Sequence, residues 1–178
     1  MNRIWPEFVY PIVDTAWRSR LVLTGRGYPL HRGEPIRPCF VVGAPRSGNT
    51  LVRRILTTND QLHIPPETYV LAQVIRAFRR HRAQPWHHLV LLVLALFEFN
   101  PEFDRFGVSL RPLFKELRDA PRDARSLALI LDRLYRYHGE SVNRSCERWG
   151  DKTPLNIYCL PELRSVFPGA QFIHVVRD

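Results

Sequence analysis

The chain has 178 residues, of which 45% are hydrophobic and 24% are charged, and its net charge is +9. These values suit one globular domain with a real core, and they argue against a disordered chain. Arginine supplies nearly all of the positive charge, because the only lysines are Lys115 and Lys152. The surplus favours an anionic partner, such as a nucleotide, a sulfated or phosphorylated group, nucleic acid or an anionic membrane, without selecting one.

The cysteines and the apolar segments bear on the cellular compartment in which the protein is expected. Cys39, Cys146 and Cys159 form no CxxC pair and no His/Cys set at zinc spacing. An odd count of this kind favours reduced thiols in a cytoplasmic protein. The first residues lack the apolar core of a signal peptide. The most apolar run, residues 89–97, is too short to span a bilayer, so we expect a buried helix there.

Residues 1–37 are weakly periodic and rich in arginine, glycine and proline. We interpret them as an N-terminal arm, with one short helix and a loop, that precedes the main domain at residues 38–178.

A strand, a glycine loop and a helix follow the arm. Residues 39–42 are apolar and β-branched, residues 43–48 read G-A-P-R-S-G, and a helix is expected from Thr50 to about residue 58. This order cradles phosphates, because loop N–H groups and the helix N-terminus point at one spot. Gly43, Gly48 and Thr50 have Walker A spacing. Asn49 replaces the Walker lysine, however, and the loop carries Arg46 instead.

The remaining elements are predicted from prolines and periodicity. Residues 61–66 should be extended, because each residue before a proline avoids the helical region. We expect a helix opening at Glu67, an apolar helix after Pro85, and a connector at residues 100–122 with one short helix near residues 113–117. Further on we expect a helix at residues 126–138 that ends at Gly139, a polar turn at residues 149–154, a helix at residues 157–167 and a strand at residues 170–176.

Two apolar strands joined through helices favour a parallel α/β sheet. Ligands of such sheets bind beyond the carboxyl ends of the strands. The loop at residues 43–50 follows one strand, and Arg177 and Asp178 follow the other. We therefore expect both to face one anionic ligand with two charged ends.

These motifs resemble those of sulfotransferases. Residues 43–50, G-A-P-R-S-G-N-T, are similar to the family's 5′-phosphosulfate loop, G-x-P-[RK]-S-G-T-[TS]. Residues 172–178 resemble the strand leading into its 3′-phosphate motif, and residues 150–154 resemble its lysine turn. Residues 63–68 resemble the segment that carries the glutamate base of tyrosylprotein-type enzymes. The four motifs stand in the family order over residues 38–178.

The resemblance implies a P-loop-like, three-layer α/β fold with a central parallel sheet. It implies sulfuryl transfer from 3′-phosphoadenosine 5′-phosphosulfate (PAPS) to an acceptor hydroxyl or amine, without a metal. Arg46, Ser47, Gly48, Asn49 and Thr50 would hold the 5′-phosphosulfate.

The other family positions fall later in the chain. Glu67 would be the general base, with His63 in reserve. Lys152 and Arg46 would stabilise the transferring group. Arg177 would bind the 3′-phosphate, with Asp178 orienting it. In the family a Gly-Arg and a serine-bearing helix follow, so we expect a C-terminally truncated domain whose 178 residues turn over weakly alone.

The same residues also have ordinary structural interpretations. Glu67 could be an ordinary residue of a first helical turn, Lys152 a solvated turn cation paired with Asp151, and Arg177 a charged strand end. His174 should be a packed strand residue. Two other functions remain open: a P-loop kinase or NTPase with a degenerate loop, and a basic module that binds polyanions. The latter ranks last, because the sequence shows no nucleic-acid motif.

Overall fold

The computed structural model describes residues 15–16, 19, 27–58, 61–144 and 147–177. Most of the helix predicted for the arm, together with Cys146 and Asp178, lies outside these ranges. Along the described chain the order of elements is β1 (Cys39–Gly43), α2 (Asn49–Leu56), β2 (Leu62–His63), α3 (Leu71–His81), α4 (Trp86–Glu98), the 3₁₀ helix η1 (Pro101–Phe106), α5 (Arg111–Arg118), α6 (Leu127–Ser141), β3 (Arg148–Lys152), the 3₁₀ helix η2 (Pro154–Cys159), α7 (Leu160–Val166) and β4 (Gln171–Val175).

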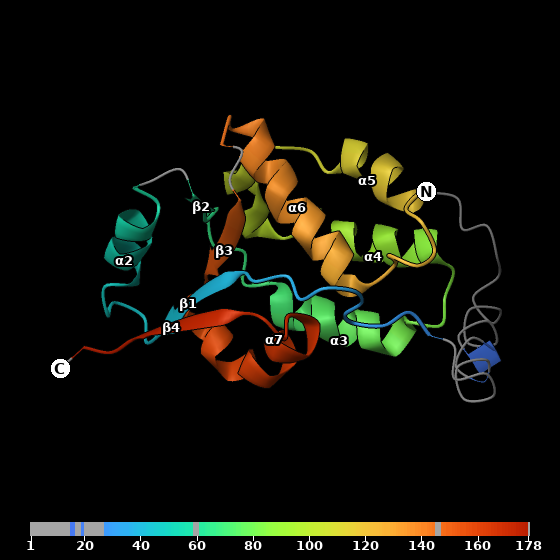
Figure 1. Ribbon diagram of the computed structural model, residues 1–178, viewed down its shortest axis with the longest axis horizontal. Coiled ribbons are helices and arrows are strands. Elements are labelled where there is room, and N and C mark those ends of the chain that lie inside the picture. Colours follow the sequence, from blue (N-terminus) through green and yellow to red (C-terminus); the bar gives the residue numbers. More distant parts are fainter. Residues whose placement is uncertain (1–14, 17–18, 20–26, 59–60, 145–146, 178) are drawn as a thin grey trace.

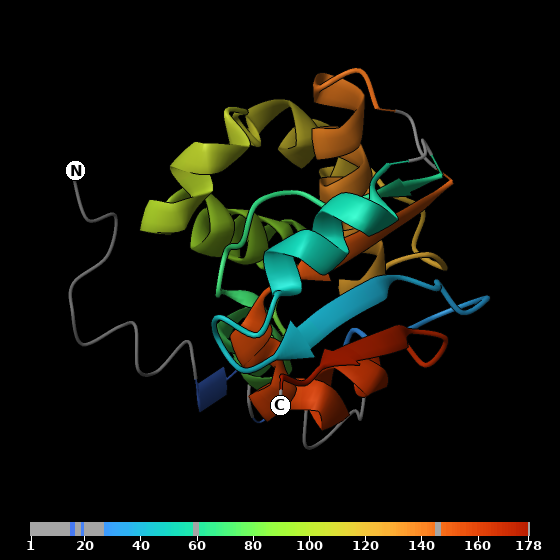
Figure 2. The same ribbon diagram turned by 90° about the vertical axis from the view of Figure 1, so that its left-hand side faces the viewer.

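Four parallel strands form the sheet, in the order β2-β3-β1-β4 (Figure 1). The predicted parallel α/β architecture is therefore confirmed. All strands end at the same edge, and from there the chain turns back so that α2 lies against β1 and β3. Figure 2 shows α2 passing in front of β3, with β1 and β4 side by side below. Glycine makes this close packing possible, because a Cβ on Gly43 would lie 2.4 Å from the Val175 carbonyl oxygen.

The core packs on one face of the sheet. Phe40 of β1 contacts the rings of Trp149, Phe167 and Phe172, and Trp149 stacks on Tyr135 of α6 at 4.2 Å. The apolar run predicted as a buried helix forms α4, whose Leu89, Val90, Val93 and Phe97 belong to the same core. Burial of this apolar surface is the main stabilising contribution to the fold.

One prediction about the sheet is wrong. Residues 149–154 do not form a polar turn, because residues 148–152 are the buried strand β3, between β2 and β1. Strand geometry sends successive side chains to opposite faces. Trp149 and Asp151 therefore face α6, whereas Lys152 faces the side on which α2 lies. A Cβ on Gly150 would lie 2.4 Å from the Cys39 carbonyl oxygen of the neighbouring strand β1. Position 150 therefore requires glycine.

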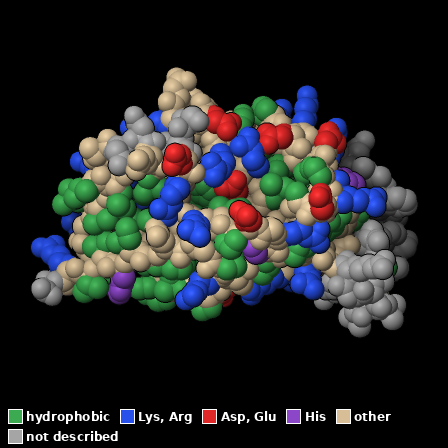
Figure 3. Space-filling model, in the orientation of Figure 1, with side chains coloured by type: hydrophobic (Ala, Val, Ile, Leu, Met, Phe, Trp, Pro, Cys, Tyr) green, Lys and Arg blue, Asp and Glu red, His purple; other side chains and the backbone are tan. Residues whose placement is uncertain are grey.

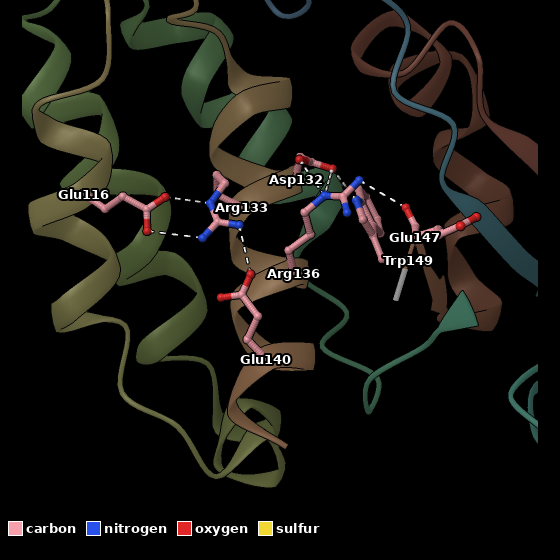
Figure 4. Close-up of polar contacts among 7 residues, drawn as sticks. All are labelled: Glu116, Asp132, Arg133, Arg136, Glu140, Glu147 and Trp149. Carbon is pink, nitrogen blue, oxygen red and sulfur yellow. Dashed lines mark hydrogen bonds and ion pairs between the residues drawn. The ribbon is translucent and has the colours of Figure 1, made fainter. Parts of the chain in front are cut away.

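Ion pairs and hydrogen bonds fix α6 against β3 and α5 (Figure 4). Arg133 holds Glu116 of α5 and Glu140 of its own helix, at 2.6 and 3.2 Å. Asp132 accepts a hydrogen bond from the Trp149 indole at 2.7 Å, and it also pairs with Arg136. The strand that carries Asp151 and Lys152 is thus held in place from its core side.

Helix boundaries show further differences. The helix predicted at residues 157–167 is divided, because residues 157–159 belong to the 3₁₀ helix η2 and α7 begins only at Leu160. The helix predicted to open at Glu67 begins only at Leu71, because Tyr69 has a positive φ of 56° that interrupts helical backbone. Gly139 does not end α6, which continues to Ser141. A Cβ at Gly139 would lie 3.2 Å from the His63 ring, so this glycine permits the close approach of β2.

The described part of the arm packs on the helical body. The backbone N–H of Tyr28 donates to the carbonyl of Arg82, and the carbonyls of Pro29 and Leu30 accept from the first residues of α6. No helix among the described residues is long and apolar enough to cross a membrane. The division into an arm and a domain stays a prediction.

Candidate functional site

The predicted phosphate loop connects β1 to α2 beyond the carboxyl edge of the sheet. The chain turns at Arg46 (φ 65°) and at Gly48 (φ 97°), and Gly48 precedes the first helical residue. No side chain of the described residues caps α2, and its first turn holds no acidic residue. Its leading N–H groups and its positive dipole end therefore point toward the loop, as an anion site requires.

Asn49 stabilises the loop from within. Its side chain is buried, and its amide donates to the Ala44 carbonyl at 2.8 Å. The amide thus closes the loop, and Asn49 also lines the hollow in which the 5′-phosphosulfate is expected. Its Oδ1 atom is buried without a partner in the described part of the chain. Asn49, at the position of the Walker lysine, thus stabilises the loop through a hydrogen bond within it.

Lys152 and Glu67 meet next to this loop. Lys152 is only 5% exposed, and its ammonium forms an ion pair with the Glu67 carboxylate. The same Nζ lies 3.4 Å from Oγ1 of Thr50, on the first turn of α2. Lys152 is therefore not a solvated turn cation, and its partner is not Asp151. A buried pair of this kind must be well matched, because both charges have left water.

Asp151 points the other way, into the core. It accepts hydrogen bonds from the hydroxyl of Tyr135 at 2.8 Å and from the amide of Asn156 at 2.7 Å. Burial raises the pKa of Asp151 to about 6, against the lowering effect of the Tyr135 hydrogen bond. These contacts tie β3 to α6 and η2, and they hold the neighbouring Lys152 in position.

One hollow of about 480 Å³ collects most of the predicted residues. We call it the loop hollow. Arg177 reaches it from the end of β4, so the two strand ends do face a common space. Ser47 is the one predicted loop residue that does not line it, and its N–H is 3.4 Å from the Ala44 carbonyl oxygen. The lining residues are Pro45, Arg46, Gly48, Asn49, Thr50, Glu67, Tyr69, Lys152, Pro154 and Arg177.

Tyr69 is a lining residue that sequence reasoning missed. Its hydroxyl donates to the Glu67 carboxylate, and this hydrogen bond, with burial, raises the pKa of Tyr69 to about 12. The positive φ that brings the ring there has no signal in the sequence. Glu67 is consequently held by two side chains, Lys152 and Tyr69. Glu67 is not in a first helical turn, because α3 begins only at Leu71. Its interpretation as an ordinary residue of a first helical turn is therefore wrong.

The histidines lie elsewhere. His63 is buried beside His138, with 2.8 Å between Nε2 and Nδ1, and it does not line the loop hollow. Burial, then the neighbouring His138, Arg144 and Arg53, lower the pKa of His63 to about 4. His174 is exposed on β4, so the expectation of a packed residue is wrong. Among the described residues, no group of three or more His, Cys, Asp or Glu side chains could hold a metal ion.

Comparison with known proteins assigns the family. The model of the "Sulfotransferase family" matches residues 38–178, which is most of the chain. The chain belongs to this family. The match begins where the arm was predicted to end and includes every element of the loop hollow.

Individual relatives agree. Protein-tyrosine sulfotransferase 1 of Danio rerio is 30% identical over 78% of this chain, and the human protein of that name is 27% identical over 85%. Nodulation protein NoeE of Sinorhizobium fredii is 28% identical over 79%. The aligned regions cover 32%, 33% and 28% of these relatives, so the chain spans about a third of their length.

Proposed function

We propose that the chain carries the donor site of a sulfotransferase that moves a sulfuryl group from PAPS to a hydroxyl or amine of an acceptor. The family supports the class of reaction. One observation carries the assignment of the site: the Lys152 ammonium lies between Thr50 and the Glu67 carboxylate, in the hollow onto which the phosphate loop opens.

The residues present fit such a donor. The uncapped start of α2 and the Arg46 guanidinium favour the 5′-phosphosulfate. Arg177, exposed at the same hollow, would bind the 3′-phosphate. A sulfuryl group carries less negative charge than a phosphoryl group, so arginine and lysine suffice to stabilise it. The Walker lysine position itself is held by Asn49, whose amide donates to the Ala44 carbonyl within the loop.

The proposed step is an in-line displacement. The acceptor oxygen or nitrogen attacks sulfur, and the bond between sulfur and the 5′-phosphate oxygen breaks. The bonding pair leaves with that oxygen, giving 3′,5′-adenosine bisphosphate. Glu67 takes the acceptor proton. Lys152 turns from Glu67 to the sulfuryl oxygens as they arrive, which frees the carboxylate to accept that proton.

Nucleotide binding tests this proposal. Because we expect weak turnover by the 178 residues alone, the first readout is calorimetric titration with 3′,5′-adenosine bisphosphate and with Mg-ATP. We expect saturable binding of the bisphosphate that is at least tenfold tighter, and an at least tenfold loss in Arg46→Ala. Tighter binding of Mg-ATP would favour the P-loop kinase or NTPase instead.

The role of Glu67 is tested by Glu67→Gln. The amide keeps the size of the side chain and its hydrogen bond with Tyr69, but it cannot take a proton. Sulfuryl transfer from labelled PAPS should fall at least about 100-fold, with bisphosphate affinity kept within about threefold. Tyr69→Phe is the matched control, because it removes a partner of Glu67 without removing the base. Equal rates in wild type and Glu67→Gln would exclude the carboxylate as base.

A further inference from the structure

A second hollow, of about 370 Å³, lies along the same two segments as the loop hollow. It is lined by the later turns of α2 and by residues 63–66, which lead to Glu67. We call it the arginine hollow, after Arg53, Arg54 and Arg144. Its other lining residues are Thr57, His63, Ile64, Pro65, Pro66, His138 and Val142.

Its charge is one-sided. Arg53 donates to the Ile64 carbonyl at 2.9 Å, and that carbonyl is neutral. Arg54 and Arg144 are exposed at the rim. Burial lowers the pKa of Arg53, the carboxylates of Glu67 and Asp151 raise it, and the repulsion of Arg144 and Arg54 lowers it again. No acidic side chain lines this hollow in the described part of the chain. Three guanidinium groups without a carboxylate between them repel one another, unless an anion lies among them.

Nearby acids are held elsewhere. Glu140 pairs with Arg133 at 3.2 Å (Figure 4), and it does not line the arginine hollow. Glu67 pairs with Lys152. On the face seen in Figure 3, acidic and basic side chains are interspersed, which is the usual arrangement of a soluble surface. The arginine hollow departs from that pattern.

We propose that the arginine hollow is a second anion site, which binds the sulfate or phosphate monoester of a small organic molecule. Guanidinium forks match the oxygens of such groups. The volume exceeds that of one oxyanion, so an organic body fits beside it, against Pro65, Pro66 and Val142. The site is separate from the donor site and does not depend on the proposed function.

The buried pair of His63 and His138 should respond to an anion bound in the arginine hollow, because both residues line it. His63 and His138 line the hollow at 6% and 4% exposure. The charged and titratable groups facing His63 are Arg53 and Arg54 on α2, Tyr135, Arg136, His138 and Glu140 on α6, and Arg144 and Arg148 before and on β3. Most are cationic, so a bound anion favours protonation of His63. A sulfate monoester, which does not titrate between pH 5 and 7, should therefore bind more tightly at pH 5.

The test uses the whole chain and NMR signals of the His63 and His138 ring C–H groups. Glucose 6-sulfate should shift both signals saturably, whereas glucose should not. Inorganic sulfate should bind at least threefold more weakly, because it lacks the organic body. Glucose 6-phosphate, tested at pH 7, should bind as the sulfate does. Equal binding of inorganic sulfate would overturn the assignment of an ester.

Variants separate the two hollows. Arg54 and Arg144 are exposed, so Arg54→Gln with Arg144→Gln should fold normally, and it should weaken the sugar sulfate at least tenfold. Arg111→Gln, an exposed arginine on α5, is the matched control. Arg46→Ala should leave this affinity unchanged while it weakens bisphosphate binding at least tenfold. The proposal is wrong if the double variant binds the sugar sulfate as tightly as wild type, or if wild type shows no saturable shift.

Discussion

The loop hollow and the arginine hollow lie along the same helix and the same extended segment, yet they balance charge differently. In the loop hollow the cations Arg46, Lys152 and Arg177 face the carboxylate of Glu67, and Lys152 is paired with it. In the arginine hollow, the ionisable lining groups within the part of the chain that the structure describes are guanidinium groups and imidazoles, without a carboxylate. An internal counter-ion lets a cation be buried, as Lys152 is, whereas cations without one stay near water.

Lys152→Met should show the largest effect on stability. The substitution removes the cation that pairs with Glu67, whose side chain is only 17% exposed. Removing one partner of a buried ion pair lowers the free energy of unfolding by about 3–5 kcal/mol. The loss should be smaller if Glu67 becomes protonated. The measurement is urea unfolding at pH 7.5, and the control is the double variant Lys152→Met with Glu67→Gln, which should regain most of the loss. Additive losses would show that the pair is not a coupled unit.

The histidine pair predicts a pH effect in the arginine hollow. The pKa of His63 is about 4 in the fold and near 6.5 in the unfolded chain, so the unfolded state binds more protons between these values. Stability should therefore rise with pH through this window, by about 2 kcal/mol. His63→Gln should remove this rise.

The measurement is the unfolding free energy at pH 4.5 and pH 7, compared between wild type and His63→Gln. Asp151 acts in the opposite direction, because its folded pKa of about 6 lies above its unfolded value, so its contribution is lost as pH rises. It is present in both proteins and cancels in the difference. His174→Gln, on exposed β4, is the control. A rise of the same size in His63→Gln would contradict the account.

Arg46→Gly should have the smallest effect on stability. Arg46 holds a positive φ of 65°, which costs a residue with a side chain up to about 1 kcal/mol relative to glycine. Glycine should leave stability unchanged or raise it slightly, while bisphosphate affinity falls at least tenfold. Thermal unfolding and calorimetry on the same samples give both values. A large loss of stability would mean that Arg46 is a structural residue of the loop.

The phosphate loop could be predicted from sequence because its signals are local. A β-branched run, two glycines at fixed spacing and a helix start determine β1, the turn and α2 together. The helix α6 and the strand β4 follow from local patterns in the same way, whereas α7 is shorter than the helix predicted at residues 157–167. The apolar run of α4 was also correctly assigned to the core.

The surroundings of Lys152 could not be predicted, because they depend on contacts between distant segments. Residues 148–152 contain a glycine and three charged side chains, which is unlike a central strand, and only their place between β2 and β1 makes them one. The Glu67 pair joins positions 85 residues apart. Tyr69 is brought to Glu67 by a backbone conformation that no local pattern predicts. The pairing of His63 with His138 is likewise set by the approach of β2 to Gly139.

A crystal structure of the chain with 3′,5′-adenosine bisphosphate would test the central claim most directly, because it shows which hollow binds the nucleotide. We expect the 5′-phosphate at the N–H groups that begin α2, in contact with Arg46 and Lys152, and the 3′-phosphate toward Arg177. A nucleotide bound in the arginine hollow, with the loop hollow vacant at saturating concentration, would contradict it.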